Sequence, residues 1–228
     1  MEHNLTNEQL YRQIEDEIVT LKIPPGEILS ENTLCKRLNI SRTPVRSLLQ
    51  RLAQNGFVQI VPNRGTIVTA IDLDIATQGI YQRLAVEYMV LRDFLNICSP
   101  TDMARLSYIH QQLLEIGSDY QNNENFDINH FLSVDLSAHQ VWFEATNKMY
   151  LWKSLTRPQA DYSRFIRLDI MKGGNVPDVL KEHEELLRVI DEKAFDAIEP
   201  LLKRHLYGGV RRLGGQLFSE EYKNYFKA

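Results

Sequence analysis

Residues 30–70 read SENTLCKRLNISRTPVRSLLQRLAQNGFVQIVPNRGTIVTA, and this stretch decides the fold of the N-terminal part. Ser30 and Ser41 each precede a run with apolar residues at helical spacing, so each is expected to cap a short helix. Two further runs, rich in β-branched residues, flank the turn at 62–65, which predicts a two-stranded hairpin. The expected strands are 57–61 and 66–70.

A further amphipathic helix is expected upstream of this stretch, before Pro24 interrupts the chain. Its apolar residues recur every three or four positions, at Leu10, Ile14, Ile18 and Leu21. Three helices followed by a hairpin form the element order of a winged helix-turn-helix. We therefore expect residues 1–70 to form a winged helix-turn-helix domain.

The same stretch is locally basic, although the whole chain carries 26 basic and 30 acidic residues and a net charge of −4. Residues 30–70 contain six basic residues and one acid. In the third expected helix, Arg42 and Arg46 lie about 40° apart on one face, with Thr43 beside them in the first turn. A guanidinium group fits the edge of guanine, so this helix is expected to read double-stranded DNA.

The hairpin turn offers a second contact with DNA. Arg64 and Gly65 stand at its tip, where an arginine can enter the minor groove and a glycine lets the backbone approach closely. This pattern favours a wing that binds DNA beside the helix contact.

From about residue 71 the pattern changes to long helical periodicity with short breaks. We expect a linker over 71–78 and an all-α bundle over 79–228, which makes the protein mainly α. No apolar stretch is long enough for a membrane helix, and the two cysteines have no metal or redox spacing, so a cytoplasmic protein is expected. The expected helices are 73–97, 101–121, 125–145, 148–171, 176–192 and 194–214.

Four polar side chains in the bundle have spacings that suit a metal site. Asp135 and His139 are separated by one helical turn, and His183 and His205 lie on the last two expected helices. One carboxylate and three imidazoles from facing helices can bind zinc, nickel, manganese or iron. For a single histidine, a hydrogen-bonded core or surface position is the alternative interpretation.

The N-terminal stretch resembles the DNA-binding domain of the GntR family of transcription regulators. The resemblance implies that Arg42 and Arg46 read bases and that Ser41, Thr43 and Arg51 hold the DNA backbone. Gly65 then marks the tip of the wing. The family often has an arginine where this chain has Asn32. The matching residues are Gly26 to Glu31, Leu38, Ile40 to Arg46, Leu52, Gly56, Pro62, Arg64 and Gly65.

The second half resembles the FadR-type effector domain, also called FCD, over about residues 75–215. The resemblance implies that the metal ligands are Asp135, His139, His183 and His205. It also implies that Arg83, Asn147 and Arg164 contact the effector. The six expected bundle helices are similar in number to those of the VanR-type branch.

These observations together predict a homodimeric transcription regulator, with a repressor expected, that binds a palindromic DNA operator. A divalent metal with one carboxylate ligand retains positive charge and open positions, which favours a small carboxylate or sugar-acid effector. Three alternatives remain open. They are a bundle that senses the metal itself, a metal-dependent enzyme built on the bundle, and a bundle that serves for dimerisation alone.

Overall fold

The structure is a computed structural model that describes residues 6–121, 126–214, 217 and 219–227. The chain forms two compact units. The first unit contains residues 1–77 together with 158–167 and 215–228. The second contains residues 78–157 and 168–214. The predicted bundle of 79–228 therefore contributes two of its segments to the first unit.

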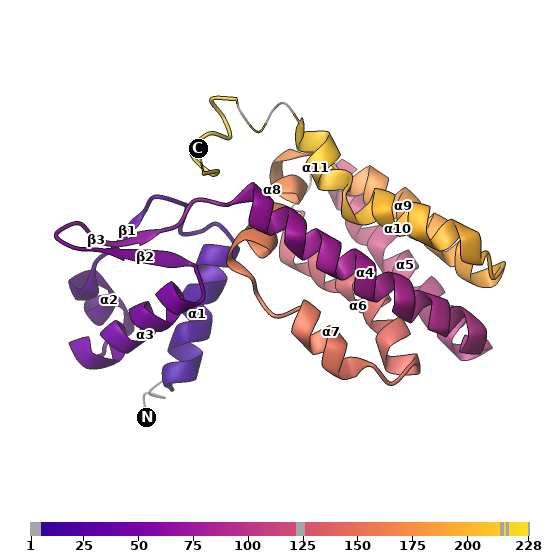
Figure 1. Ribbon diagram of the computed structural model, residues 1–228, viewed down its shortest axis with the longest axis horizontal. Helices are drawn as coiled ribbons and strands as arrows, with labels where there is room; N and C mark the ends of the chain where they lie inside the picture. The colour runs from indigo at the N-terminus through magenta and orange to yellow at the C-terminus, as the bar shows by residue number, and fades with distance from the viewer. Residues whose placement is uncertain (1–5, 122–125, 215–216, 218, 228) are drawn as a thin grey trace. The chain divides into compact units, whose positions relative to one another are not determined.

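Three helices build most of the first unit (Figure 1), as the sequence predicts. They are α1 (Asn7–Val19), α2 (Glu31–Leu38) and α3 (Arg42–Gln54). Ser30 caps α2, because its side chain accepts a hydrogen bond from the backbone N–H of Thr33. Ser41 occupies the N-cap position of α3, as predicted, but its side chain makes no capping hydrogen bond. Helix α1 ends before Leu21, which has a φ of 59°.

A small antiparallel sheet completes the winged fold (Figure 1). Its outer strand β2 pairs with β3 as the expected hairpin, with Val61 opposite Gly65. The other outer strand, β1, was not predicted, because two residues carry no alternation that a sequence pattern could reveal. The strands are β1 (Ile28–Leu29), β2 (Val58–Val61) and β3 (Gly65–Val68).

The core of this unit lies between the three helices and the sheet. Burial of about 25 cal/mol per Å² of apolar surface makes this contact the main source of stability for the unit. One face of α3 is committed to the core, so its other face remains exposed. The fully buried residues include Ile14, Ile18, Val45, Leu52 and Phe57.

The described residues of the second unit form helices joined by short connections, with no strand among them, and its long helices run beside one another (Figure 1). Helix α4 begins at Leu73, so most of the predicted linker over 71–78 is helical. The first residue of the helix expected over 125–145 lies outside the described residues. The helices after the sheet are α4 (Leu73–Ile97), α5 (Pro100–Gln121), α6 (Ile128–Ala145), α7 (Met149–Leu155), α8 (Ala160–Lys172), α9 (Val176–Asp191), α10 (Ile198–Leu206) and α11 (Gly208–Leu213).

The expected count of six helices is wrong. The helix predicted over 148–171 is two helices, α7 and α8, because Pro158 lacks an N–H group and disfavours helical backbone at the residue before it. The helix predicted over 194–214 divides into a 3₁₀ turn, α10 and α11. The helix count therefore gives no support to the VanR-type branch.

The bundle core is apolar and continuous from α4 to α10. Helix α5 packs against α6 and α9, and α9 packs against α10. Among the described residues, no helix combines the length and the apolar character that a membrane span requires. Fully buried core residues include Leu91, Phe94, Leu113, Phe131, Phe143 and Leu202.

Candidate functional site

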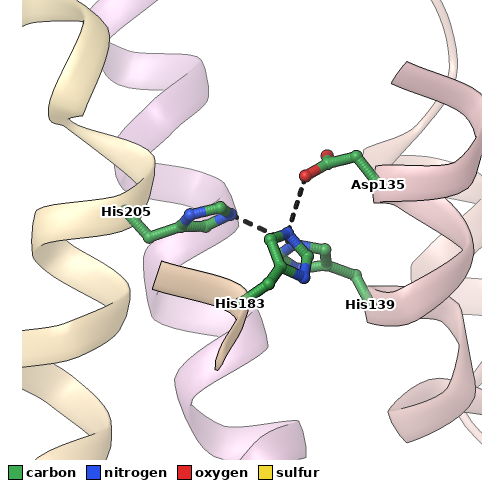
Figure 2. Close-up of side chains that lie close together, drawn as sticks. All are labelled: Asp135, His139, His183 and His205. Atoms are coloured by element: carbon green, nitrogen blue, oxygen red, sulfur yellow. Dashed lines mark hydrogen bonds and ion pairs between the residues drawn. The ribbon is translucent and has the colours of Figure 1, made fainter. Parts of the chain in front are cut away.

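The structure brings together the four predicted metal ligands of the second unit (Figure 2). Asp135 and His139 project from one face of α6, His183 comes from α9, and His205 comes from α10. His183 Nε2 lies 2.8 Å from Asp135 Oδ1, and His205 Nε2 lies 3.2 Å from His139 Nε2. We call these four residues the His/Asp cluster.

The geometry of the His/Asp cluster fits one divalent ion. Its four ligand atoms all lie within 4.8 Å of one another. Atoms bound about 2.1 Å from one ion lie about 3.0 Å apart when adjacent in an octahedron, and about 4.2 Å apart when opposite. Since the side chains of His139 and His183 are buried, the cluster is shielded from water on that side. The widest spacing is slightly larger than the octahedral value, so the cluster is compatible with a metal centre after a small adjustment of its side chains.

Two further carboxylates orient the imidazoles of the cluster. Glu87 Oε2 lies 2.6 Å from His139 Nδ1, and Glu182 Oε2 lies 3.0 Å from His205 Nδ1. A histidine that donates its Nδ1 proton to a carboxylate presents the Nε2 lone pair, and the ring becomes a stronger metal ligand. Both Nε2 atoms face the centre of the cluster, as metal binding requires.

Glu87 was missed by sequence reasoning, although it is completely buried on α4. Its partner Arg83 stands one turn away, with Nε 2.5 Å from Glu87 Oε1. In a sequence, such a pair is typical of a surface salt bridge. The signal that could have identified it is a glutamate followed by the apolar residues Val90 and Leu91 on a core-facing helix.

Burial and charge set the ionisation of these groups. Burial disfavours the charged form of Glu87, but Arg83 and His139 outweigh this effect and lower its pKa to about 2. For His183, burial outweighs the attraction of Asp135 and lowers the pKa to about 4. At neutral pH, Glu87 is therefore ionised and His183 is neutral, which is the form that binds metals.

The three predicted effector contacts lie in different places. Arg83 is buried beside the His/Asp cluster, with Nη2 3.4 Å from His139 Nδ1. Asn147 is exposed in the turn after α6, with a φ of 58°. Arg164 is fully buried in the first unit, where it donates hydrogen bonds to Ala160 and Thr69. Of the three, Arg83 is the residue that the structure places at the cluster.

The predicted DNA-reading residues form an exposed surface at the start of α3. Arg42, Thr43 and Arg46 are all solvent-exposed there. Residues of α2 hold both arginines, since Arg42 Nη2 donates to Asn32 Oδ1 at 3.1 Å and Arg46 Nε donates to Glu31 at 3.0 Å. Asn32, which stands where the family often has arginine, therefore positions Arg42.

The remaining predicted DNA contacts lie around this surface. Ser41 precedes α3 and is exposed. Arg51 forms an ion pair with Glu8 and its guanidinium carbon lies 3.8 Å from the centre of the Tyr11 ring. Arg64 and Gly65 lie at the exposed tip of the β2–β3 hairpin, where Gly65 has a φ of 101° that favours glycine.

Comparisons with known proteins agree with this architecture. Residues 6–68 match the bacterial regulatory proteins of the gntR family, and residues 80–208 match the FCD domain. The chain is 28% identical over 224 residues to the HTH-type transcriptional repressor RspR of Escherichia coli K12, covering 94% of both chains.

Two solved structures share the fold. A GntR protein from Rhodococcus sp. RHA1 has a TM-score of 0.66 at 20% identity, covering 92% of this chain and 98% of the other. E. coli McbR/YncC has a TM-score of 0.68 at 16% identity, covering 92% and 97%. The matching families and RspR are regulators rather than enzymes, which removes the enzyme alternative. The chain belongs to the GntR family of bacterial transcription regulators, in the subfamily whose DNA-binding domain is followed by an FCD domain.

Proposed function

We propose that this regulator binds a divalent metal in its FCD domain and that a small carboxylate or sugar-acid effector completes the metal coordination. The observation that carries the proposal is the convergence of the four ligand atoms of the His/Asp cluster within 4.8 Å. The buried contacts of Glu87 and Glu182 with the two imidazoles support it, because carboxylates in these positions are typical of metal centres. Zinc, nickel, manganese and iron all accept such ligands.

Charge explains the class of effector. A divalent ion, the Asp135 carboxylate and neutral imidazoles together carry one positive charge. Beside these ligands, Arg83 compensates the charge of Glu87, and Glu182 shares Arg204 with Glu185. An octahedral ion with four protein ligands keeps two open positions, which a carboxylate can fill while neutralising the charge. Arg83 is the residue that we propose as a further contact for such an anion.

The regulator is proposed to act as a homodimer on DNA in the cytoplasm, with repression as the expected outcome. Two copies of α3 would read the half-sites of a palindrome about one helical turn apart, and Arg64 would enter the minor groove. The exposed apolar residues Tyr81 and Met89 on α4, two turns apart, support pairing of two FCD domains. Effector binding would favour one arrangement of the dimer and so change operator affinity.

Elemental analysis of tag-free protein purified without chelator tests the metal centre. We expect about one divalent ion per chain, lost in His183→Ala and His205→Ala and retained in His130→Ala, whose histidine is exposed on α6. Circular dichroism of each variant checks that it is folded. Absence of metal from the wild-type protein after reconstitution would refute the proposed centre.

Operator binding tests the effector. A duplex selected from a random library serves as the operator, and its affinity is measured with and without small carboxylates and sugar acids. A response in wild-type protein that disappears in His183→Ala supports the proposal, whereas an unchanged response contradicts it. Two alternatives predict other outcomes. If the protein senses the metal itself, operator affinity follows the free metal concentration with no organic effector present. If the bundle only dimerises, operator affinity responds to neither metal nor effector.

A further inference from the structure

A second, strongly charged cleft lies on the FCD domain outside the His/Asp cluster. Its volume is about 360 Å³, which lies within the range of small-molecule sites. Helix α9 contributes one wall, and α10 and α11 contribute the other. We call it the α9–α11 cleft.

Basic side chains outnumber acidic side chains in the lining of the α9–α11 cleft. Four basic and three acidic side chains line it. Arg204 forms an ion pair with Glu185, and Arg212 lies 3.4 Å from Asp178. Among the residues that the structure describes, Lys181 and Arg211 have no carboxylate partner, and both are exposed to solvent. Arg211 Nη2 donates a hydrogen bond to the backbone carbonyl oxygen of Arg204 at 2.6 Å, which leaves its charge without a neutralising carboxylate. The positive charges of Lys181 and Arg211 are therefore open to an anionic ligand.

The cleft also offers hydrogen-bond acceptors, because the carboxylates of Asp178 and Glu185 share its walls with the cations. A ligand with anionic groups alone would meet repulsion from these carboxylates. Hydroxyl groups can donate hydrogen bonds to them, while an acidic group of the same ligand meets Lys181 and Arg211. We propose that the α9–α11 cleft is a second ligand site, which binds a small polyhydroxylated organic anion.

Gly208 shapes the cleft by leaving room for Arg212. A Cβ atom at Gly208 would lie 2.6 Å from Arg212 Nη1 and 2.8 Å from Nη2, so any larger residue would displace the guanidinium. The buried Asp169 also holds Arg212, since Arg212 Nη2 lies 3.0 Å from Asp169 Oδ2. Glycine at this position therefore leaves room for the guanidinium in its present place.

Glu182 joins the α9–α11 cleft to the His/Asp cluster. Its Oε1 lies 3.7 Å from Arg204 Nε on the cleft side, and its Oε2 lies 3.0 Å from His205 Nδ1. An anion that draws Arg204 away from Glu182 would remove positive charge from beside this carboxylate. The hydrogen bond between Glu182 and His205 Nδ1 would then become stronger. This coupling rests on the proposed function, whereas the anion site itself does not require a metal.

Calorimetric titration of metal-free, full-length protein tests the site. The probes are 6-phosphogluconate, D-gluconate and inorganic phosphate, all at one ionic strength. We expect 6-phosphogluconate or gluconate to bind more tightly than phosphate, because phosphate lacks hydroxyl groups on a carbon chain. Tightest binding by phosphate would overturn the assignment of a polyhydroxylated ligand, and absence of binding by all three would overturn the site.

A matched pair of double variants locates the binding. Lys181→Gln/Arg211→Gln removes both available cations, and we expect an affinity loss of about tenfold or more. Arg188→Gln/Lys203→Gln removes two exposed charges from α9 and α10 outside the cleft, and we expect little change. Equal losses in the two variants would mean non-specific attraction and would refute the site. Metal content of the first variant distinguishes this failure from failure of the proposed metal centre, since it should remain one ion per chain.

Discussion

Replacing Glu87 by glutamine tests whether this buried carboxylate tunes the proposed metal centre. The glutamate side chain is completely buried, 2.6 Å from His139 Nδ1 and 2.5 Å from Arg83 Nε. Glu87→Gln keeps the size of the side chain and removes its charge. Loss of a carboxylate that orients a histidine ligand typically lowers metal affinity about 10- to 100-fold. This corresponds to about 1.4–2.7 kcal/mol of binding free energy.

The same substitution also affects folding, because it removes the carboxylate of the buried Arg83–Glu87 ion pair. Removing one member of a buried ion pair typically costs about 3–5 kcal/mol of unfolding free energy. The double variant Arg83→Gln/Glu87→Gln removes both charges and should recover part of this stability. It still lacks the carboxylate beside His139, so its metal affinity should remain low. The two variants thus separate stability from metal affinity.

Urea unfolding of metal-free protein measures the stability of both variants, and competition with a chromophoric chelator measures their metal affinity. Glu144→Gln serves as the control, since Glu144 is partly exposed, pairs with Arg105 and lies outside the His/Asp cluster. A folded double variant with wild-type metal affinity would refute the argument that Glu87 acts through His139.

Four further predictions concern the DNA-binding domain. Arg46→Gln should weaken operator binding by about 1–3 kcal/mol and relax the base preference at one position of each half-site, as measured with single-base operator variants. Equal base preference in the wild type and in Arg46→Gln would contradict this prediction. Arg64→Gln should mainly reduce the salt dependence of operator binding. Gly65→Ala should lower the unfolding free energy by about 1–3 kcal/mol, because φ is 101° and the new Cβ would lie 3.2 Å from Ile28 Cγ2. A urea unfolding midpoint equal to that of the wild type would argue against this strain. Leu52→Ala should cost about 2–5 kcal/mol in the same assay, since the side chain is fully buried, and a smaller loss would mean that the core closes around the cavity.

The sequence predicts the winged helix-turn-helix well because its signals are local. Ser30 and Asn39 define the limits of α2, and the apolar stripe of α3 from Val45 to Leu52 repeats with helical spacing. The third strand escapes such reasoning, because Ile28 and Leu29 are a strand only through their pairing with β3. Long-range pairing leaves no periodic signal in two residues.

The candidate metal centre likewise combines residues that local sequence patterns predict with residues that only tertiary packing brings together. Asp135 and His139 are separated by one turn, so their common face follows from helix geometry alone. His183 and His205 lie far away in sequence, and their place beside α6 depends on how three helices pack. Glu87 is harder still to predict from the sequence, because only tertiary packing reveals that its ion pair with Arg83 is buried rather than exposed.

The ion pair between Arg46 and Glu31 has a consequence for the search along DNA. The pair is exposed, with 63% and 37% of the two side chains accessible, so breaking it costs at most about 1 kcal/mol. A bidentate contact with guanine returns about 1–3 kcal/mol, whereas other bases return little. If Arg46 reads guanine, as we propose, it would therefore stay paired with Glu31 on non-cognate DNA. The regulator would then move along such DNA with this side chain folded back until it meets a guanine.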